Sequence, residues 1–203
     1  MKNKKDNIPN GGITKEEMNI AEYPLTLLSK RIPEGLKTIE YNDWVTINGK
    51  QVPLSWVVTG SDKYGLPTSE DQDFFIALIK IWHEEDFKDR IIPIKSIYSV
   101  LKELGLPDTK HYRNRFKLSL DRLTGLYITA KNAFWDYEDR CYLTDIGFHI
   151  FDKYELKKDE ESNIISGYIE VNGFFYRSVK KGYLKNLDYD FYLKLPDGLP
   201  RRL

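Results

Sequence analysis

The sequence predicts an α+β fold built on a winged helix, meaning a helix-turn-helix followed by a β-hairpin wing. Two observations point to it. Two amphipathic segments are joined by a short Gly-Leu-Pro-Asp turn, and a β-rich segment follows the second one directly. We further expect an additional N-terminal hairpin, and C-terminal strands and short helices after the wing.

The N-terminal segment divides into a polar part and a hairpin. Residues 1–20 are rich in Gly, Asn and Lys, which predicts a disordered polar arm. Residues 21–203 then form one winged-helix DNA-binding or dimerisation domain. From Thr38 to Thr59, two β-rich runs flank Asn48-Gly49, which is a strong hairpin signal. Pro53 predicts an edge position or a break in the second strand.

A central scaffold helix is expected from Ser69 to about Glu85. Ser69 with Gln72 three residues later matches a capping box, and acidic residues in the first turn suit the helix dipole. Its apolar residues cover more than half of the circumference, which predicts a helix in the middle of the core. These residues are Phe74, Phe75, Leu78, Ile79, Ile81 and Trp82.

The helix-turn-helix pair follows a short β-like run, Ile91–Ile94. In the first helix, apolar residues recur at i, i+3, i+4 and i+7, and Gly105 and Pro107 end it. Asp108 is expected to cap the second helix, which runs to Thr124. The apolar stripes of the two helices consist of Ile97, Val100, Leu101 and Leu104, and of Tyr112, Phe116, Leu120 and Leu123.

The wing is expected immediately after this pair. Leu126–Ala130 and Arg140–Leu143 are predicted to pair around an acidic turn at 136–139. Two more β-like segments, Phe148–Leu156 and Ile164–Val171, flank a charged turn. Asn172-Gly173 fits either a hairpin turn or the cap of a helix over Phe174–Lys181, and the helix is favoured. The last amphipathic segment covers Asp188–Leu195.

Charge is distributed unevenly in a chain whose formal net charge is zero. Between Lys110 and Arg122, five basic residues face one acidic residue, whereas the rest of the chain carries 26 basic and 30 acidic residues. A neutral protein polarised in this way can turn one face toward a polyanion.

The basic residues of the second helix define the candidate site. Arg113 and Asn114 are expected to read base edges in the major groove, while lysines and Arg115 contact phosphates. The competing interpretations are an ordinary solvated face and a winged helix that serves dimerisation or protein contacts. The acidic turn of the expected wing would repel phosphate and suits a protein contact better. The candidate DNA-binding residues are Lys110, Arg113, Asn114, Arg115, Lys117 and Arg122 on the helix, and Lys131 and Arg140 on the wing.

Signals for other functions are weak. His83, His111 and His149 lack metal-ligand spacing, and no phosphate-binding glycine loop is present, so we expect no enzyme, no cofactor and no metal. Cys141 lies in an expected strand and favours a core position over a nucleophile. The four tryptophans are expected to pack in the core. A single cysteine, no apolar run of about 20 residues and no secretory signal favour a cytoplasmic protein without membrane contact.

Several segments together resemble the plasmid replication initiators of the replication initiator protein A family. The residues that carry the likeness include Trp56–Gly60, the Tyr-Gly-Leu-Pro-Thr turn at 64–68 before the apolar helix, and Leu120–Gly125. Further ones are Ile97-Tyr98, Leu101, Tyr112, and Gly182-Tyr183 to Arg202-Leu203. The likeness covers about residues 24–203.

This resemblance implies two winged-helix domains that bind repeated double-stranded DNA sites at a plasmid origin and recruit host replication machinery. It also implies a homodimer in exchange with a monomer. In the family, the segment resembling Leu199–Leu203 leads into the second winged helix, which is expected to be absent or truncated here. The binding residues carry over only as the helix Asp108–Thr124. A winged-helix transcriptional repressor and a dimerisation or host-factor docking module remain alternatives.

Overall fold

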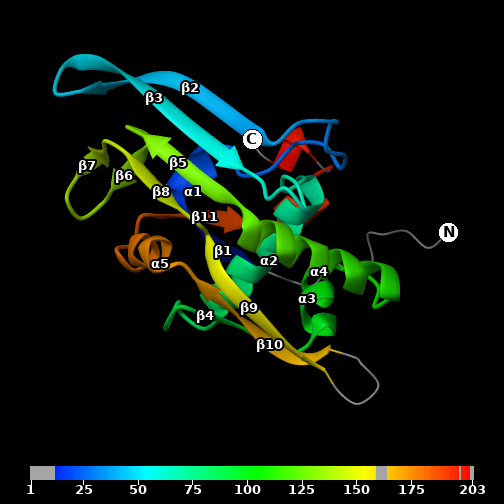
Figure 1. Ribbon diagram of the computed structural model, residues 1–203. Helices are drawn as coiled ribbons and strands as arrows, with labels where there is room; N and C mark the ends of the chain where they lie inside the picture. The colour runs from blue at the N-terminus through cyan, green and yellow to red at the C-terminus, as the bar shows by residue number, and fades with distance from the viewer. Residues whose placement is uncertain (1–11, 159–163, 197, 202–203) are drawn as a thin grey trace.

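The computed structural model describes residues 12–158, 164–196 and 198–201 (Figure 1). It has a mixed α+β fold, as the sequence predicts. The helices are α1 (Met18–Glu22), α2 (Ser69–Glu84), α3 (Ile97–Glu103), α4 (Lys110–Gly125), α5 (Gly173–Lys180) and α6 (Tyr189–Lys194), followed by a short 3-10 turn (Leu199–Arg201). The strands are β1 (Ile13–Glu17), β2 (Thr38–Ile47), β3 (Lys50–Thr59), β4 (Ile91–Ile94), β5 (Tyr127–Lys131), β6 (Phe134–Asp136), β7 (Cys141–Leu143), β8 (Ile146–Phe148), β9 (Phe151–Lys158), β10 (Ile164–Val171) and β11 (Leu184–Asp188).

The helix-turn-helix region is built around a three-stranded sheet. Its strands have the order β4-β10-β9, and both pairings are antiparallel. Helix α4 contacts α2, α3 and β9, so three elements hold the second helix of the pair in place (Figure 1). The expected strands at 164–171 and 91–94 are present as β10 and β4, whereas the expected segment at 148–156 is divided between the end of β8 and β9, which begins at Phe151.

The hairpin expected directly after α4 is wrong in its pairing. Strand β5 pairs with β3 and β8 in a four-stranded sheet of order β2-β3-β5-β8, whereas β7 pairs with β6 in a separate two-stranded sheet. The reason is that Ile128 and Ala130 alternate inward and are fully buried against the neighbouring strands, so β5 is an interior strand. The N-terminal hairpin itself is confirmed: β2 and β3 pair from Thr38↔Thr59 to Ile47↔Lys50.

The expected disordered arm is wrong for residues 12–20. Strand β1 pairs antiparallel with β11, and Glu17 caps α1 by accepting a hydrogen bond from the backbone N–H of Ile20 at 2.9 Å. Ile20 and Asn19 are fully buried. A strand from the far end of the chain thus supplies hydrogen bonds that the polar N-terminal sequence alone did not reveal. Residues 1–11 lie outside the described part of the structure.

Helix α2 is the centre of the core, as predicted. Phe74, Phe75 and Trp82 are at most 2% exposed, and only Ile81 of the predicted apolar set is half-buried. The helix cap lies one residue earlier than expected, because the carboxylate of Asp71 accepts the N–H of Thr68 at 2.7 Å.

Two predictions about the C-terminal region are confirmed and two about single side chains are wrong. Helix α5 forms where Asn172 was expected to cap it, and α6 begins after Asp188. Cys141 is exposed because β7 lies in a two-stranded ribbon. Trp44 is 65% exposed on the edge strand β2.

Candidate nucleic-acid interface

Helix α4 begins after a turn that glycine permits. Gly105 has φ +61°, which ends α3, and Thr109 then caps α4 by accepting the N–H of Tyr112 at 3.4 Å. The expected cap, Asp108, has another partner, described below. The cap is therefore one residue later than the sequence pattern predicted.

One side of α4 is buried against the core. Phe116, Leu120 and Leu123 are fully buried, and the rings of Phe116 and Phe74 are 5.4 Å apart. These positions lie four and three residues apart, so they occupy a single face of the helix. The predicted apolar stripe is confirmed, and it fixes which side of α4 faces solvent.

The exposed polar residues on the other side of α4 include three of the expected site residues. Lys110, Asn114 and Lys117 are separated by four and three residues and project from one side of the helix. The side chain of Lys117 is 49% exposed and lies 3.1 Å from Asp121. These three residues are the part of the expected basic face that the structure keeps together and exposed.

Arg113 lies beside this face and binds the turn before the helix. Its Nε and Nη2 atoms lie 2.6 Å and 2.8 Å from the two carboxylate oxygens of Asp108, in a bidentate pair. These hydrogen bonds hold the pKa of the Asp108 carboxyl below its ordinary value. Because the Arg113 side chain is 38% exposed, the pair lies at the surface at the start of α4.

Arg115 and Arg122 turn toward α2, contrary to the expectation that they flank an exposed face. Arg115 forms an ion pair with Glu70. Arg122 is 17% exposed and donates to Asp71 at 2.9 Å and to the carbonyl oxygen of Tyr64 at 3.0 Å. The two arginines thus link α4 to the first turn of α2, where the acidic residues of the sequence are concentrated.

A small polar cluster joins α4 to β9. Tyr154 donates to Asp121, and Lys117 lies beside both residues. Burial, together with the hydrogen bond to Asp121, raises the pKa of Tyr154, so its hydroxyl stays protonated at neutral pH. The cluster fixes the position of β9 relative to the exposed side of α4.

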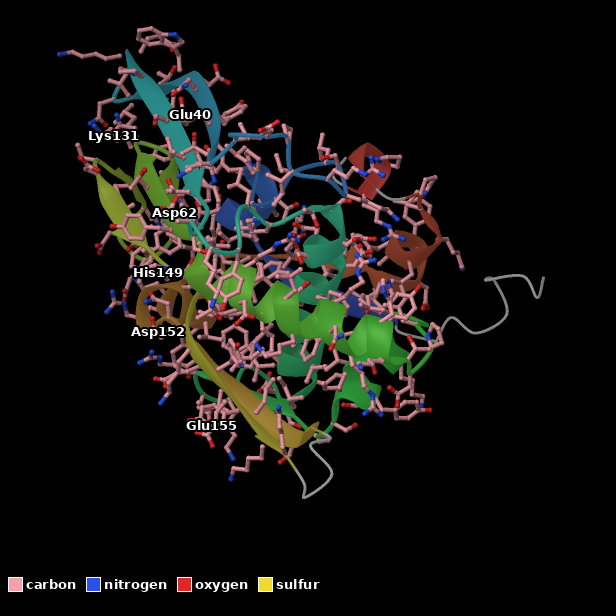
Figure 2. All side chains as sticks on the ribbon, turned by 45° about the vertical axis from the view of Figure 1, so that its right-hand side comes forward. Glu40, Asp62, Lys131, His149, Asp152 and Glu155 are labelled. Atoms are coloured by element: carbon pink, nitrogen blue, oxygen red, sulfur yellow. The ribbon has the colours of Figure 1, made fainter. Side chains whose placement is uncertain are left out.

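Lys131 and Arg140 lie apart from α4. Lys131 is opposite Ser55 at the end of β5, and Figure 2 shows it far from the central helix. Arg140 lies in the turn between β6 and β7 with φ +50°. The acidic residues of this turn bind α5, since Asp136 and Glu138 form ion pairs with Lys181 at 3.1 Å and 2.7 Å.

Sequence reasoning missed two exposed lysines at the end of β9. Lys157 and Lys158 end β9, the strand that contacts α4, and both are exposed. The sequence placed them in the charged turn between two strands. The signal that could have identified them is that this turn joins two β-like segments, 148–156 and 164–171. These segments form a second candidate hairpin after the helix pair, so a second candidate wing.

The described residues contain no group of three or more His, Cys, Asp and Glu side chains arranged to hold a metal ion. Among the same residues, no helix combines the length and the apolar character needed to cross a bilayer.

Comparisons with known proteins give one family model and two similar solved structures. The family model described as "Replication initiator protein A" matches residues 15–203. Two solved structures are similar: a selenomethionine derivative of domain 2 and domain 3 of RctB, and the RctB domains 2-3. Each has 13% sequence identity and a TM-score of 0.51, covering 85% and 81% of this chain and 63% and 59% of the RctB chains.

The chain therefore spans about three fifths of the length of the solved structures it matches, and at this identity the likeness concerns the fold. A search of curated proteins finds no relative that matches.

Proposed function

Because the chain belongs to the replication initiator protein A family, we propose that it starts replication of a plasmid by binding repeated double-stranded DNA sites at the origin. The family membership supports the role in replication initiation. The fold and the exposed side of α4 support the DNA-binding part of the proposal.

The order of the elements supports the winged-helix part of the proposal. A winged helix has a strand, a helix-turn-helix pair and a final β-hairpin, and β4, α3, α4, β9 and β10 follow one another in this order, with the segment β5 to β8 between α4 and β9. In this arrangement the wing is the hairpin of β9 and β10, which contacts α4, and the segment β5 to β8 is an insertion. Lys157 and Lys158 then lie on the wing.

The observation that carries the proposal is the exposed row of Lys110, Asn114 and Lys117 on a helix fixed by its buried side. In a major groove, the Asn114 amide can bond adenine N6 and N7, and the two lysines can contact phosphates. Arg113 can exchange its surface pair with Asp108 for guanine O6 and N7, since exposed ion pairs contribute little stability.

Recognition of this kind is non-covalent, so the proposed role is not enzymatic and needs no cofactor. The same proposal includes host replication proteins as partners, a homodimer, and a cytoplasmic location. A repressor with this fold would use the same helix, and it would be distinguished by a promoter palindrome in place of tandem origin repeats beside the gene.

Fluorescence anisotropy with a duplex carrying the direct repeats, and with a shuffled duplex, tests the proposal. Asn114→Ala should weaken specific binding by about 1–3 kcal/mol and relax one base position. Lys50→Ala, at the start of β3 on the far hairpin, is the control and should bind like the unmodified protein. Equal affinity for both duplexes, or a dimer that does not bind DNA, would contradict DNA recognition and favour a docking module.

A further inference from the structure

Strand β2 forms an open edge of the four-stranded sheet. Among the described residues, only β3 pairs with it. Strand β5 pairs with β3 only from Ser55 to Thr59, so the outer half of the β2–β3 hairpin extends beyond the sheet (Figure 1). An unpaired strand of this length presents a row of backbone donors and acceptors.

The register identifies which backbone groups of β2 point away from β3. Trp44 lies opposite Pro53, and proline has no N–H, so this pair cannot exchange hydrogen bonds. Because paired and unpaired positions alternate, the even-numbered residues of β2 direct their N–H and C=O groups away from β3. The N–H of Trp44 accordingly donates to the side chain of Asp43 at 2.8 Å.

The two edges of the hairpin differ in how they are protected. On the β3 edge, Pro53 lacks a donor, and its carbonyl accepts the side-chain amide of Asn132 at 2.9 Å. The β2 edge contains no proline and no lysine, which are common protections against strand pairing. It instead exposes Trp44 and Tyr41, at 65% and 39%.

The charge of this edge argues against nucleic acid as its partner. The charged residues of β2 are Glu40 and Asp43, and both are acidic. Figure 2 shows Glu40 on the hairpin, well away from α4. The edge is therefore separate from the proposed DNA-binding side of the molecule.

We propose that β2 pairs antiparallel with β2 of a second copy, around a two-fold axis at Asn42. The outward-directed backbone groups belong to even-numbered residues, so the register must place even-numbered residues opposite one another, which an axis at any residue of β2 satisfies. An axis at Asn42 pairs residues 38–46 of the two copies, with Thr38 opposite Thr46. This stretch of β2 is longer than the one that an axis at Tyr41 or Trp44 would pair.

The side chains fit this register. On one face, Ile39 lies opposite Val45 and Tyr41 lies opposite Asp43, which accepts the hydroxyl of Tyr41 within one chain at 2.9 Å. An axis at Asp43 would pair as many residues but would place two Asp43 carboxylates directly opposite each other, and an axis at Glu40 would do the same for Glu40, which is unfavourable. In the dimer, Asp43 releases the N–H of Trp44, which then donates to the carbonyl of Glu40 of the other copy.

Cysteine cross-linking tests this register. In a Cys141→Ser background, Asn42→Cys places two thiols at the axis, where Cα atoms about 5.5 Å apart are within reach of a disulfide. Thr46→Cys is the control, because its two copies would lie roughly 27 Å apart. With copper phenanthroline as oxidant, Asn42→Cys should form a covalent dimer and Thr46→Cys should not. Failure of Asn42→Cys to cross-link, or equal cross-linking of both, would overturn the register.

Sedimentation without DNA tests the pairing in a second way. Asn42→Pro removes a donor from the β2 edge, and Gln51→Pro removes the equivalent donor from the β3 edge; neither donor bonds within the hairpin. The unmodified protein and Gln51→Pro should be dimers, and Asn42→Pro a monomer. A monomeric unmodified protein, or a dimeric Asn42→Pro, would overturn the proposal. The proposal specifies the homodimer of the proposed function, and because no DNA is used, its failure leaves DNA recognition by α4 standing.

Discussion

The Nη1 atom of Arg122 lies 2.9 Å from Oδ2 of Asp71, which bonds the last turn of α4 to the first turn of α2. Asp71 is 3% exposed and also accepts hydrogen bonds from Thr68 and from the hydroxyl of Ser119. One buried carboxylate therefore caps α2 and fixes the position of α4, so the orientation of the candidate DNA-binding helix depends on it.

Replacing Arg122 with alanine should destabilise the protein. The change leaves the buried carboxylate of Asp71 without its charged partner, which costs about 3–5 kcal/mol in comparable buried pairs. The free energy of unfolding, measured with urea, should fall by this order, whereas Arg113→Ala, at a surface pair, should lower it by less than about 1 kcal/mol. Equal losses for the two variants would show that Arg122 does not link the helices.

Gly60→Ala should also lower stability, because Gly60 is where two backbone segments approach each other. A Cβ atom at Gly60 would lie 2.6 Å from the carbonyl carbon of Gly65, and backbone cannot move aside as a side chain can. The loop held there carries the Tyr64 carbonyl that accepts from Arg122. We expect a loss of about 1–3 kcal/mol in urea unfolding.

Gly147→Ala is the matched control for this prediction. There the added Cβ would meet the hydroxyl end of the Tyr127 side chain, which can rotate away. It should therefore cost clearly less than Gly60→Ala. The reverse order would mean that the loop at 60–65 tolerates displacement.

Local patterns in the sequence were sufficient for the longer helices and for the β2–β3 hairpin, but not for α1 or for pairing between strands distant in the chain. Phe116, Leu120 and Leu123 recur at helical spacing, so the buried side of α4 could be predicted from the sequence. Buried and more exposed residues alternate along strand β5, as in many strands, and this pattern does not identify β3 as its neighbour. Strand β1 is polar, and its partner β11 is about 170 residues away along the chain.

The candidate site was predicted in part for the same reason. Helical spacing correctly placed Lys110, Asn114 and Lys117 on one exposed side. Spacing does not show which arginines meet acids on another helix, and Glu70 and Asp71 of α2 engage Arg115 and Arg122. The acidic cluster was visible in the sequence, but its contact with α4 is a tertiary feature.

Glu17 should make stability depend on pH in a defined direction. Burial raises the pKa of its carboxyl above the ordinary 4.5, although Ser178 and the N–H of Ile20 oppose this by donating to it. A carboxyl whose pKa is raised by folding binds its proton more tightly in the folded state. The stabilisation that this proton binding adds to the free energy of unfolding is therefore fully present below pH 4.5. It is lost as pH rises through the pKa of Glu17 in the folded protein.

The comparison with Glu17→Gln isolates this contribution from that of other carboxyls. The unfolding free energy of the unmodified protein minus that of Glu17→Gln should decrease as pH rises from 4 toward neutral. Urea unfolding at a series of pH values measures it. A difference that increases with pH would mean that the hydrogen bonds to Glu17 outweigh its burial.

Lys117→Ala and Lys110→Ala should weaken DNA binding without changing its sequence preference. A lysine that neutralises one phosphate releases a counterion, so each loss should reduce the slope of log affinity against log salt concentration by about 0.9. Asn114→Ala should leave that slope unchanged while it relaxes specificity, because an amide releases no counterion. Anisotropy titrations at four salt concentrations separate the two effects. If the slope is unchanged in both lysine variants, DNA phosphates do not lie along this side of α4, and the wing lysines Lys157 and Lys158 become the next positions to substitute.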